Sequence, residues 1–431
     1  MKKFTLSLLL LVLSICTFLL QGCIKDTCET KHQYTCYTPV YKTKAEVRAN
    51  IKSNSPKEIS NPGKIFIIGK YIFLNEIDKG IHVIDNTNTS SPKNIAFIDI
   101  PGNVDLAVSG NILYADFYTD MIALDISNPL NVIITKFIEG VFPPFRYDGS
   151  LVEGSQMVRV DWIKHDTTVI EDCNNRVLYY SSDNCPNCSV NVSYLNSTAN
   201  SWGASSSPVS SPNGIGGSMA RFVLLNSRLY TVSNQDLNVF NISTPKEPIF
   251  VKKLAISNWN VETIFPFKNK LFIGSSSGMF IYAVNNADNP ELEGQFAHVR
   301  TCDPVIADDD FAFVTLSSGS TCGGITNQMD VLDIKNINAP VLVKSYPLTN
   351  PHGLSKDNNL LFICDGTDGL KIFDATHADN ILPIKQITGM ETYDVITNSN
   401  NAIVIAKDGL YQYDYSNINN IRLLSKISIA K

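Results

Sequence analysis

The stretch Gly63-Lys-Ile-Phe-Ile-Ile-Gly-Lys-Tyr-Ile-Phe-Leu-Asn75, followed by Gly80-Ile-His-Val-Ile-Asp85, decides the fold. It holds two apolar runs separated by Gly69-Lys70, then a third run that ends in an acid, and a fourth run reaches Ile100. Short runs rich in Ile, Val and Phe between Gly, Asn, Asp and Pro are typical of β-strands joined by tight turns. This stretch therefore predicts four consecutive short strands.

The same phrase recurs along the whole chain. A pair of apolar residues marks its second run each time: Ile72-Phe73, Leu113-Tyr114, Leu229-Tyr230, Leu271-Phe272, Ala312-Phe313, Leu361-Phe362 and Ile403-Val404. Successive pairs lie 41, 116, 42, 41, 49 and 42 residues apart, so one unit has about 41 residues and one gap holds an insertion of about 75. Because such a unit is too small to bury both faces of its own sheet, seven units must stack on one another.

The third run of almost every unit ends in Asp or Asn. These residues are Asp85, Asp125, Asn241, Asp333, Asp374 and Asp414, whereas the fourth unit reads Ile281-Tyr282-Ala283. Aligned carboxylates suggest a metal ring, but Asx side chains before a Pro-containing turn commonly accept backbone N–H groups of that turn. We favour the second interpretation.

These repeated phrases resemble the LVIVD-repeat family of bacterial β-propellers. The resemblance covers residues 59–431 apart from the insertion. It implies an all-β, seven-bladed β-propeller with four-stranded blades, and it implies almost no chemistry, because members of this family are mostly of unknown function. Radial stacking of small four-stranded units predicts the same fold on physical grounds.

The insertion spans residues 141–215 and lacks the third-run signature. We expect a hairpin from Met157–Ile163 and Thr167–Ile170, and a disulfide-clipped lid or partner surface on one face of the propeller. A degenerate eighth blade is the alternative, because 116 residues approach three units. The ring is predicted to close near Ile421–Ile429, and residues 23–58 to form a tether in which Ala45–Ile51 adds an edge strand.

The N-terminus has the pattern of an export signal. Lys2 and Lys3 precede an apolar run from Phe4 to Leu20, and Leu20-Gln-Gly-Cys23 resembles the bacterial lipobox. The resemblance implies a lipoprotein signal peptide over residues 1–22 and acylation of Cys23, with palmitate among the chains. An uncleaved anchor helix is the alternative, although a membrane span needs roughly 20 apolar residues.

The residues after Cys23 suggest where in the cell the protein is located. Ile24-Lys-Asp26 resembles the signal that sends lipoproteins of the Bacteroidetes group to the cell surface. We therefore expect an outer-membrane lipoprotein of the cell envelope that is exposed at the surface and bound to the membrane by its lipid.

Eight cysteines remain once Cys16 and Cys23 are set aside. In an exported protein an even number indicates disulfides, with Cys28–Cys36 as the favoured local pair and Cys173 pairing with Cys185 or Cys188. Cys185-Pro-Asn-Cys188 is interpreted as structural, because zinc needs four ligands and no second such pair exists.

Charge and motifs exclude several function classes. The chain has 35 Lys+Arg against 41 Asp+Glu, a net charge of −6, which argues against a nucleic-acid partner. Gly274-Ser-Ser-Ser-Gly278 fits the pattern of a nucleophile elbow, which requires a helix after it. Because the strand-like Met279–Tyr282 follows, we predict a hairpin turn there instead.

One constellation of ionisable residues follows from the repeat. Counting back ten residues from the second residue of the apolar pair reaches Glu262, Asp303, His352 and Asp394 in four consecutive units, with Asp105 displaced by one and Arg221 beside the counted position. This position begins the innermost strand, so we expect these side chains to ring one mouth of the central channel. Carboxylates and an imidazole there suit a divalent cation or a polar ligand, and a water-filled channel mouth is the alternative.

Two functions are compatible with these features. The favoured one is a binding or scaffold module for a protein, a glycan or a small polar ligand, because no catalytic motif is found. The alternative is a metal-dependent hydrolase or lyase that uses the channel-mouth ring, since one fold hosts many chemistries.

Overall fold

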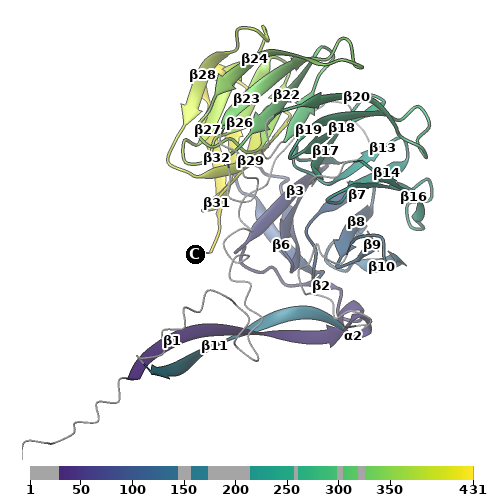
Figure 1. The fold of residues 1–431 in the computed structure, drawn as a ribbon, viewed down its shortest axis with the longest axis vertical. Helices are drawn as coiled ribbons and strands as arrows, with labels where there is room; N and C mark the ends of the chain where they lie inside the picture. The colour runs from purple at the N-terminus through teal and green to yellow at the C-terminus, as the bar shows by residue number, and fades with distance from the viewer. Residues whose placement is uncertain are drawn as a thin grey trace, which may run out of the picture. The chain divides into compact units, whose positions relative to one another are not determined.

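The computed structural model describes residues 29–143, 157–172, 214–256, 261–298, 304–318 and 326–430. Most of them belong to seven antiparallel sheets arranged in a ring, which Figure 1 shows. The predicted all-β, seven-bladed propeller is therefore confirmed, and blades 1 to 7 follow the order of the chain. The predicted signal peptide, Cys23 and Cys28 lie outside the described residues.

Each blade is built from four consecutive strands. The innermost strands are β3 Pro62–Ile68, β7 Leu106–Ser109, β13 Phe222–Leu225, β17 Val261–Phe267, β21 Val305–Ala307, β25 Leu354–Asp357 and β29 Thr392–Asn398. The second strands are β4 Tyr71–Glu76, β8 Ile112–Phe117, β14 Arg228–Val232, β18 Lys270–Ser275, β22 Phe311–Leu316, β26 Leu360–Cys364 and β30 Asn401–Ala406. The third strands are β5 Gly80–Asp85, β9 Asp120–Asp125, β15 Asp236–Asn241, β19 Gly278–Ala283, β23 Gln328–Asp333, β27 Leu370–Asp374 and β31 Gly409–Asp414. The outer strands are β6 Lys93–Asp99, β10 Ile133–Ile138, β16 Ile249–Ala255, β20 Glu291–Ala297, β24 Val341–Pro347, β28 Leu382–Ile387 and β32 Arg422–Ser428.

Blade 1 departs from the predicted four strands, because it has six. The short strand β12 (Ile215–Gly216) pairs with β3 on the inner edge, and β2 (Ser53–Asn54) pairs with β6 on the outer edge. Both additions come from segments outside the repeat. Within the described residues, each of the other blades has four strands.

The Asx residues at the end of the third strands organise the following turns, as predicted. In six blades the side-chain oxygen accepts the backbone N–H two residues later at 2.9 Å. In blade 2, hydrogen bonds from Lys246, from the Ser127 hydroxyl and from the Ser127 N–H lower the pKa of Asp125 to about 2. The Gly274–Gly278 stretch is also the predicted hairpin turn, with Ser275 paired to Gly278.

The core consists of apolar side chains packed between neighbouring blades. The second-strand aromatic residues are almost completely buried: Phe73, Tyr114, Tyr230, Phe272, Phe313 and Phe362. Burial of each such side chain contributes roughly 1.5–3 kcal/mol. These residues are the anchors by which the repeat was found, so the sequence signal and the core have the same origin.

The ring closes between two complete blades, and no blade mixes strands from both ends of the chain. An aliphatic cluster fills this seam, with Ile65 and Ile72 from blade 1 facing Ile403 and Ile405 from blade 7. The Ala430 N–H donates to the Ile59 carbonyl at 2.7 Å, and the side chains of Asn86 and Gln412 bond each other. The seam is thus held only by noncovalent contacts.

The edge strand predicted over Ala45–Ile51 is wrong. Residues Lys44–Arg48 form the short helix α2, which begins at a capping box between Thr43 and Glu46. The Thr-x-x-Glu spacing was present in the sequence and favours a helix start. Two bases of α2 bind one buried carboxylate, because Lys44 and Arg48 reach Asp120 at 2.9 and 2.8 Å. No helix in the described ranges is long and apolar enough to span a membrane.

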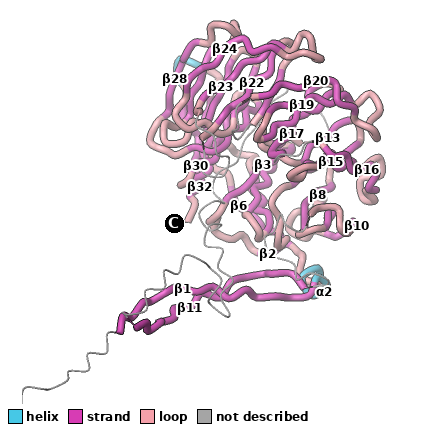
Figure 2. The backbone as a smooth tube through the Cα atoms, viewed as in Figure 1, coloured by secondary structure: helices cyan, strands magenta, loops and turns pink. Residues whose placement is uncertain are grey.

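A second unit holds a separate two-stranded sheet. Strand β1 (Glu29–Thr43) pairs with β11 (Met157–Asp172), as Figures 1 and 2 show. The predicted hairpin within residues 157–170 is wrong, since β11 is one continuous strand. Among the intervening residues Lys164, His165 and Asp166, only Asp166 is of a type that favours turns.

Two cysteines in the described part of the chain are free thiols. Cys36 is buried and unpaired, so the predicted Cys28–Cys36 disulfide is not formed. Cys364 is buried in the blade 6 core, and burial raises the pKa of its thiol well above the usual value. The remaining cysteines, including Cys173, Cys185 and Cys188, lie outside the described residues.

Candidate functional site

The residues of the predicted ring occupy two different positions when they are counted from the turn between the first two strands of each blade. Asp394 stands five residues before the turn Ser399-Asn400 that joins the first two strands of blade 7. Glu262 and His352 stand six residues before the corresponding turns of blades 4 and 6, so they occupy the neighbouring position. Glu262 is the unpaired residue of a bulge in β17 and His352 precedes β25, so neither has the ladder position of Asp394. The count from the apolar pair differs by one residue because Ile403-Val404 stands one residue further from its turn than the pairs of blades 4 and 6 do.

The position of Asp394 carries charges in four consecutive blades. From blade 1 to blade 7 its occupants are Lys64, Asp105, Arg221, Thr263, Pro304, Gly353 and Asp394. Asp105, Arg221 and Asp394 were predicted site residues, whereas Lys64 was missed. Across blades 7, 1, 2 and 3 the charges alternate in sign. Alternation allows each charge to face opposite charges in the adjacent blades.

Lys64 is the central cation of this arrangement. Its side chain is buried, and its Nζ donates to the Met219 carbonyl at 2.6 Å. It lies close enough to Asp105 and Asp394 to lower the pKa of both carboxyls. Burial has the larger and opposite effect, and it raises the pKa of Asp105 to about 6 and that of Asp394 to about 7.

The segment that joins the insertion to blade 3 crosses the centre of the ring. Residues 214–220, here called the channel segment, are bonded to the inner strands of four different blades. Gly214 N–H donates to the Val108 carbonyl of blade 2 at 3.0 Å, and the Ala220 carbonyl accepts the Ile264 N–H of blade 4 at 2.9 Å. Ser218 Oγ accepts the Leu354 N–H of blade 6 at 3.4 Å. Only a segment at the centre of the ring can contact blades 1, 2, 4 and 6 together.

Packing also fixes the channel segment. Ser218, Met219 and Ala220 are buried, and Met219 belongs to the aliphatic cluster of the seam. A Cβ atom on Gly214 would stand 2.3 Å from the Phe66 ring, so only glycine fits beside β3. The glycines of this stretch therefore serve close backbone approach.

The charges of the ring hold this segment in place. Besides the bond from Lys64, the Asp105 carboxylate accepts the backbone N–H groups of Leu106 and Arg221. Arg221 in turn donates from Nε to the Glu262 carbonyl at 3.2 Å. Two of the predicted ligand-binding residues thus bind the protein's own backbone.

Asp394 is as buried as Asp105 but differs from it, because neither carboxylate oxygen has a hydrogen bond of good geometry and, among hydrogen-bond donors, only the Val395 N–H lies near enough to lower its pKa. A buried carboxylate without donors costs free energy unless it is protonated or faces a cation. Lys64 supplies the facing cation, and the pKa of Asp394 near 7 allows the proton.

The other predicted residues do not join this cluster. His352 is buried, its Nε2 lies 3.1 Å from Asn350 Nδ2, and its ring lies edge-on to Tyr393. Burial lowers the pKa of His352 to about 4, so the imidazole is neutral at pH 7. Glu262 is only half-buried, and Asp303 lies outside the described residues. Within the described ranges no group of three or more His, Cys, Asp and Glu residues is arranged to hold a metal ion.

Sequence reasoning missed a buried acid–imidazole pair in blade 1. Burial opposes ionisation of Glu76, yet hydrogen bonds from His82 and Ser60 outweigh it and lower the pKa of Glu76 to about 2. The Glu76–His82 distance is 3.0 Å, and His82 Nδ1 lies 3.2 Å from Asn94. Because every partner is internal, this pair fixes the start of blade 1.

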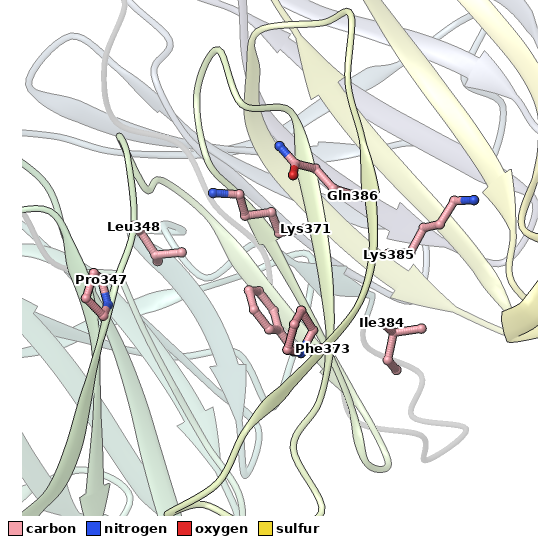
Figure 3. Close-up of a pocket in the computed structure, with 8 residues that line it drawn as sticks. Pro347, Leu348, Lys371, Phe373, Ile384, Lys385 and Gln386 are labelled. Carbon is pink, nitrogen blue, oxygen red and sulfur yellow. The ribbon is translucent and has the colours of Figure 1, made fainter.

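One open groove lies between blades 5 and 6. It has a volume of about 330 Å³ and is lined by Pro347, Leu348, Lys371, Phe373, Pro383, Ile384, Lys385 and Gln386. Figure 3 shows Phe373 and Lys371 on the blade 6 side and Leu348 on the blade 5 side. Lys371 is neutralised by Asp365 and Asp368, so the groove lacks a free convergent charge there.

Comparisons with known proteins supply no family. No protein-family model matches the chain, and no curated protein matches it. Solved structures that are similar to it include three with a TM-score of 0.49 each. The computationally designed Ika8 protein is 9% identical over 87% of this chain and 90% of its own. A functionally unknown protein from Desulfotomaculum acetoxidans is 11% identical over 85% and 95%. A protein from Lactobacillus plantarum is 13% identical over 92% and 97%. At these values they carry no argument about function.

Proposed function

We propose that this chain is a lipid-anchored protein of the cell envelope whose propeller acts as a binding or scaffold module. The observation that supports this proposal is the channel segment, which occupies the centre of the ring with its own backbone. A channel crossed in this way leaves the faces and the perimeter of the propeller for contact with a protein or a glycan.

The chemistry of the alternating charges supports the same proposal. Lys64 and Asp105 are engaged by Met219 and by the backbone of Arg221, so they hold the protein's own chain. A hydrolase or lyase that used the predicted ring would need Glu262, His352 and Asp394 to converge on one substrate. His352 and Glu262 instead stand one residue further from their turns than Asp394 does, His352 before β25 and Glu262 in a bulge of β17.

The cellular location of the module is part of the proposal. Leu20-Gln-Gly-Cys23 with Ile24-Lys-Asp26 suits export, acylation of Cys23 and display on the outer membrane. The repeated phrases ending in Val83-Ile84-Asp85 and its equivalents resemble the LVIVD type of propeller. Together these features describe a module tethered to the membrane by lipid and presented to a partner.

One preparation tests binding against catalysis. The Cys23→Ser chain is purified, its metal content is measured, and its sedimentation with washed envelopes of the producing bacterium is followed as a titration. We expect saturable binding that excess unlabelled chain competes away, with no stoichiometric metal. Absence of saturable binding would contradict the module, as would one metal per chain together with substrate turnover.

The lipid anchor has its own prediction. Acylation requires the thiol of Cys23, so we expect Cys23→Ser to move the protein from the membrane fraction to the soluble fraction. The propeller should remain folded, because Cys23 lies before the first described strand. Fractionation with a Cys36→Ser control, which keeps the anchor, checks both points. Tight membrane retention of Cys23→Ser would reject the lipoprotein interpretation.

A further inference from the structure

The groove between blades 5 and 6 has apolar walls on both sides. Leu348 lies on the blade 5 wall and Phe373 on the blade 6 wall, as Figure 3 shows. Ile384 lines the groove from the outer strand β28 and is 38% exposed, and Leu382 of the same strand is 51% exposed. The volume of about 330 Å³ lies within the range of ligand pockets, about 300–1,000 Å³. Exposed apolar side chains beside a concave surface are typical of protein-binding sites.

The interior of the groove is electrically neutral. Lys371 is paired with Asp365 and Asp368 at 2.5 and 2.8 Å, so its charge is already balanced. Gln386 Nε2 donates to the Asp368 carbonyl at 2.9 Å. A carboxamide also has an acceptor oxygen, so Gln386 Oε1 can accept one N–H of a ligand. The interior therefore suits an apolar side chain whose main chain donates one hydrogen bond.

Two exposed cations flank the groove. Lys385 lines it from β28 and points away from Phe373 in Figure 3, toward a partner that extends beyond the groove. Lys344 lies on β24 with Pro347 of the groove, and its Nζ donates to the Asp379 carbonyl of blade 6 at 2.9 Å. Within the described ranges neither lysine forms an ion pair, whereas the bases on β10 and β32 are bonded to carboxylates. In a chain of net charge −6, two such cations favour a partner segment with an acidic residue.

We propose that this groove is the docking site of the module, and that its occupant is a short apolar segment of a partner protein with an acidic residue beside it. The apolar side chain packs between Leu348 and Phe373, a backbone N–H donates to Gln386, and the carboxylate faces Lys385 and Lys344. A glycan is disfavoured, because the apolar walls offer few hydrogen-bonding groups. This inference rests on the proposed function, since a binding module needs a surface at which its partner docks.

A selection of displayed peptides tests the chemistry of the occupant. A library of random dodecapeptides is selected on the immobilised Cys23→Ser chain, and we expect enriched peptides to combine large apolar residues with Asp or Glu. The most enriched peptide is then labelled with fluorescein. Ile384→Asp should raise its Kd at least about tenfold, whereas Leu423→Asp, at an exposed apolar position on the outer strand of blade 7, should leave it unchanged. Thermal melts confirm that both variants are folded. No enrichment, enrichment of basic peptides, or equal binding to Ile384→Asp would overturn the proposal.

Charge reversal tests the two lysines separately. We expect the double variant Lys344→Glu, Lys385→Glu to raise the Kd of the same labelled peptide about fivefold at low salt, and by less at high salt. Lys93→Glu, on the exposed outer strand of blade 1, makes the same type of charge change away from the groove and serves as the control. A Kd that the double variant leaves unchanged, or that Lys93→Glu raises equally, would refute the role of these lysines.

The envelope titration separates this inference from the proposed function. In the Cys23→Ser chain, Ile384→Asp should abolish most of the saturable binding to washed envelopes, and protease treatment of the envelopes should do the same. If Ile384→Asp binds as well as its parent, the partner docks elsewhere and this inference fails while the module stands. Absence of saturable binding by the parent contradicts the module itself.

Two other occupants of the groove have their own signatures. Envelope binding that survives protease treatment would assign the partner as a glycan or a lipid. A dimer of the parent chain in sedimentation velocity that Ile384→Asp dissociates would assign the groove to a second copy. Either result would overturn the proposed protein segment.

Discussion

A chain that lacks residues 391–431 is expected to lose the stable monomeric propeller. The deletion removes all of blade 7, including Ile396, Ile403 and Ile405, and exposes the faces of Ile65 and Ile72 in blade 1. Each large aliphatic or aromatic side chain that loses its burial costs roughly 1.5–3 kcal/mol. The blade 6 side of the break loses its partners as well, since Phe362 and Ile372 pack with Val395 and Val404. The summed loss exceeds the roughly 5–15 kcal/mol by which native domains are stable.

The measurement is a thermal melt by circular dichroism, combined with light scattering for the oligomeric state. Excision of residues 173–188 from the insertion is the control, and we expect it to change the melting temperature little. A truncated chain that remained monomeric and melted cooperatively would show that closure of the ring is dispensable. Because no blade mixes strands from both ends of the chain, this deletion removes a whole blade and leaves six complete ones.

The repeat made the fold predictable because the same residues carry the pattern and the core. Phe73 and its six equivalents occur once per unit and pack between blades, so their spacing reports the architecture directly. The role of the Asp and Asn residues that end the third strands could also be predicted, because an Asx turn is a local structure that depends on residues two positions apart. Local interactions leave local sequence signals.

The additions to blade 1 were not predictable for the opposite reason. Strand β12 joins Phe66 and Ile67 from about 150 residues away in the chain, and only two residues form the pairing. Nothing in the composition of Ile215-Gly216 distinguishes it from a loop. The helix α2 was predictable in principle, since Thr43 and Glu46 have the spacing of a capping box, but its β-branched and apolar neighbours favoured a strand.

Some residues of the candidate site could be predicted from the sequence, and others could not. The repeat correctly indicated that ionisable residues gather near the innermost strands, and Asp105, Arg221 and Asp394 do share one position. Lys64 was missed because the count from Phe73 reaches Gly63, whereas the pair taken in blade 7 stands one residue further from its turn. Counting from the two-residue turn instead, which has a fixed length, brings Lys64 and Asp394 into register.

The buried charges predict a distinct pH dependence of stability. An aspartate in an unfolded chain has a pKa of about 3.9, whereas burial raises the pKa of Asp394 to about 7 despite the opposing effect of Lys64. Between these two values the folded chain binds more protons than the unfolded chain, so the free energy of unfolding falls as the pH rises. Above pH 7 both states are ionised and the full cost of the buried charge remains.

The variant Asp394→Asn cannot ionise, so it removes this cost. We expect its free energy of unfolding, relative to wild type, to be more favourable at pH 8 than at pH 5 by about 2–3 kcal/mol. Urea titrations at the two pH values measure the difference, with the exposed Asp310→Asn as control. A pH-independent difference would show that Asp394 is not the titrating group.

Lys64→Met should act in the opposite direction, which separates the role of charge from that of packing. Loss of the cation removes the positive charge that lowers the pKa of Asp105 and Asp394, so the pKa of both carboxyls rises further. We expect Lys64→Met to destabilise the protein by about 3–5 kcal/mol at pH 8. The loss should be smaller at pH 5, because protonation removes the negative charges of the carboxyls. The double variant Lys64→Met, Asp394→Asn should recover most of that loss. Recovery requires that Lys64 contributes through its charge across the seam between blades 7 and 1, whereas a packing role would leave the double variant as unstable as the single one.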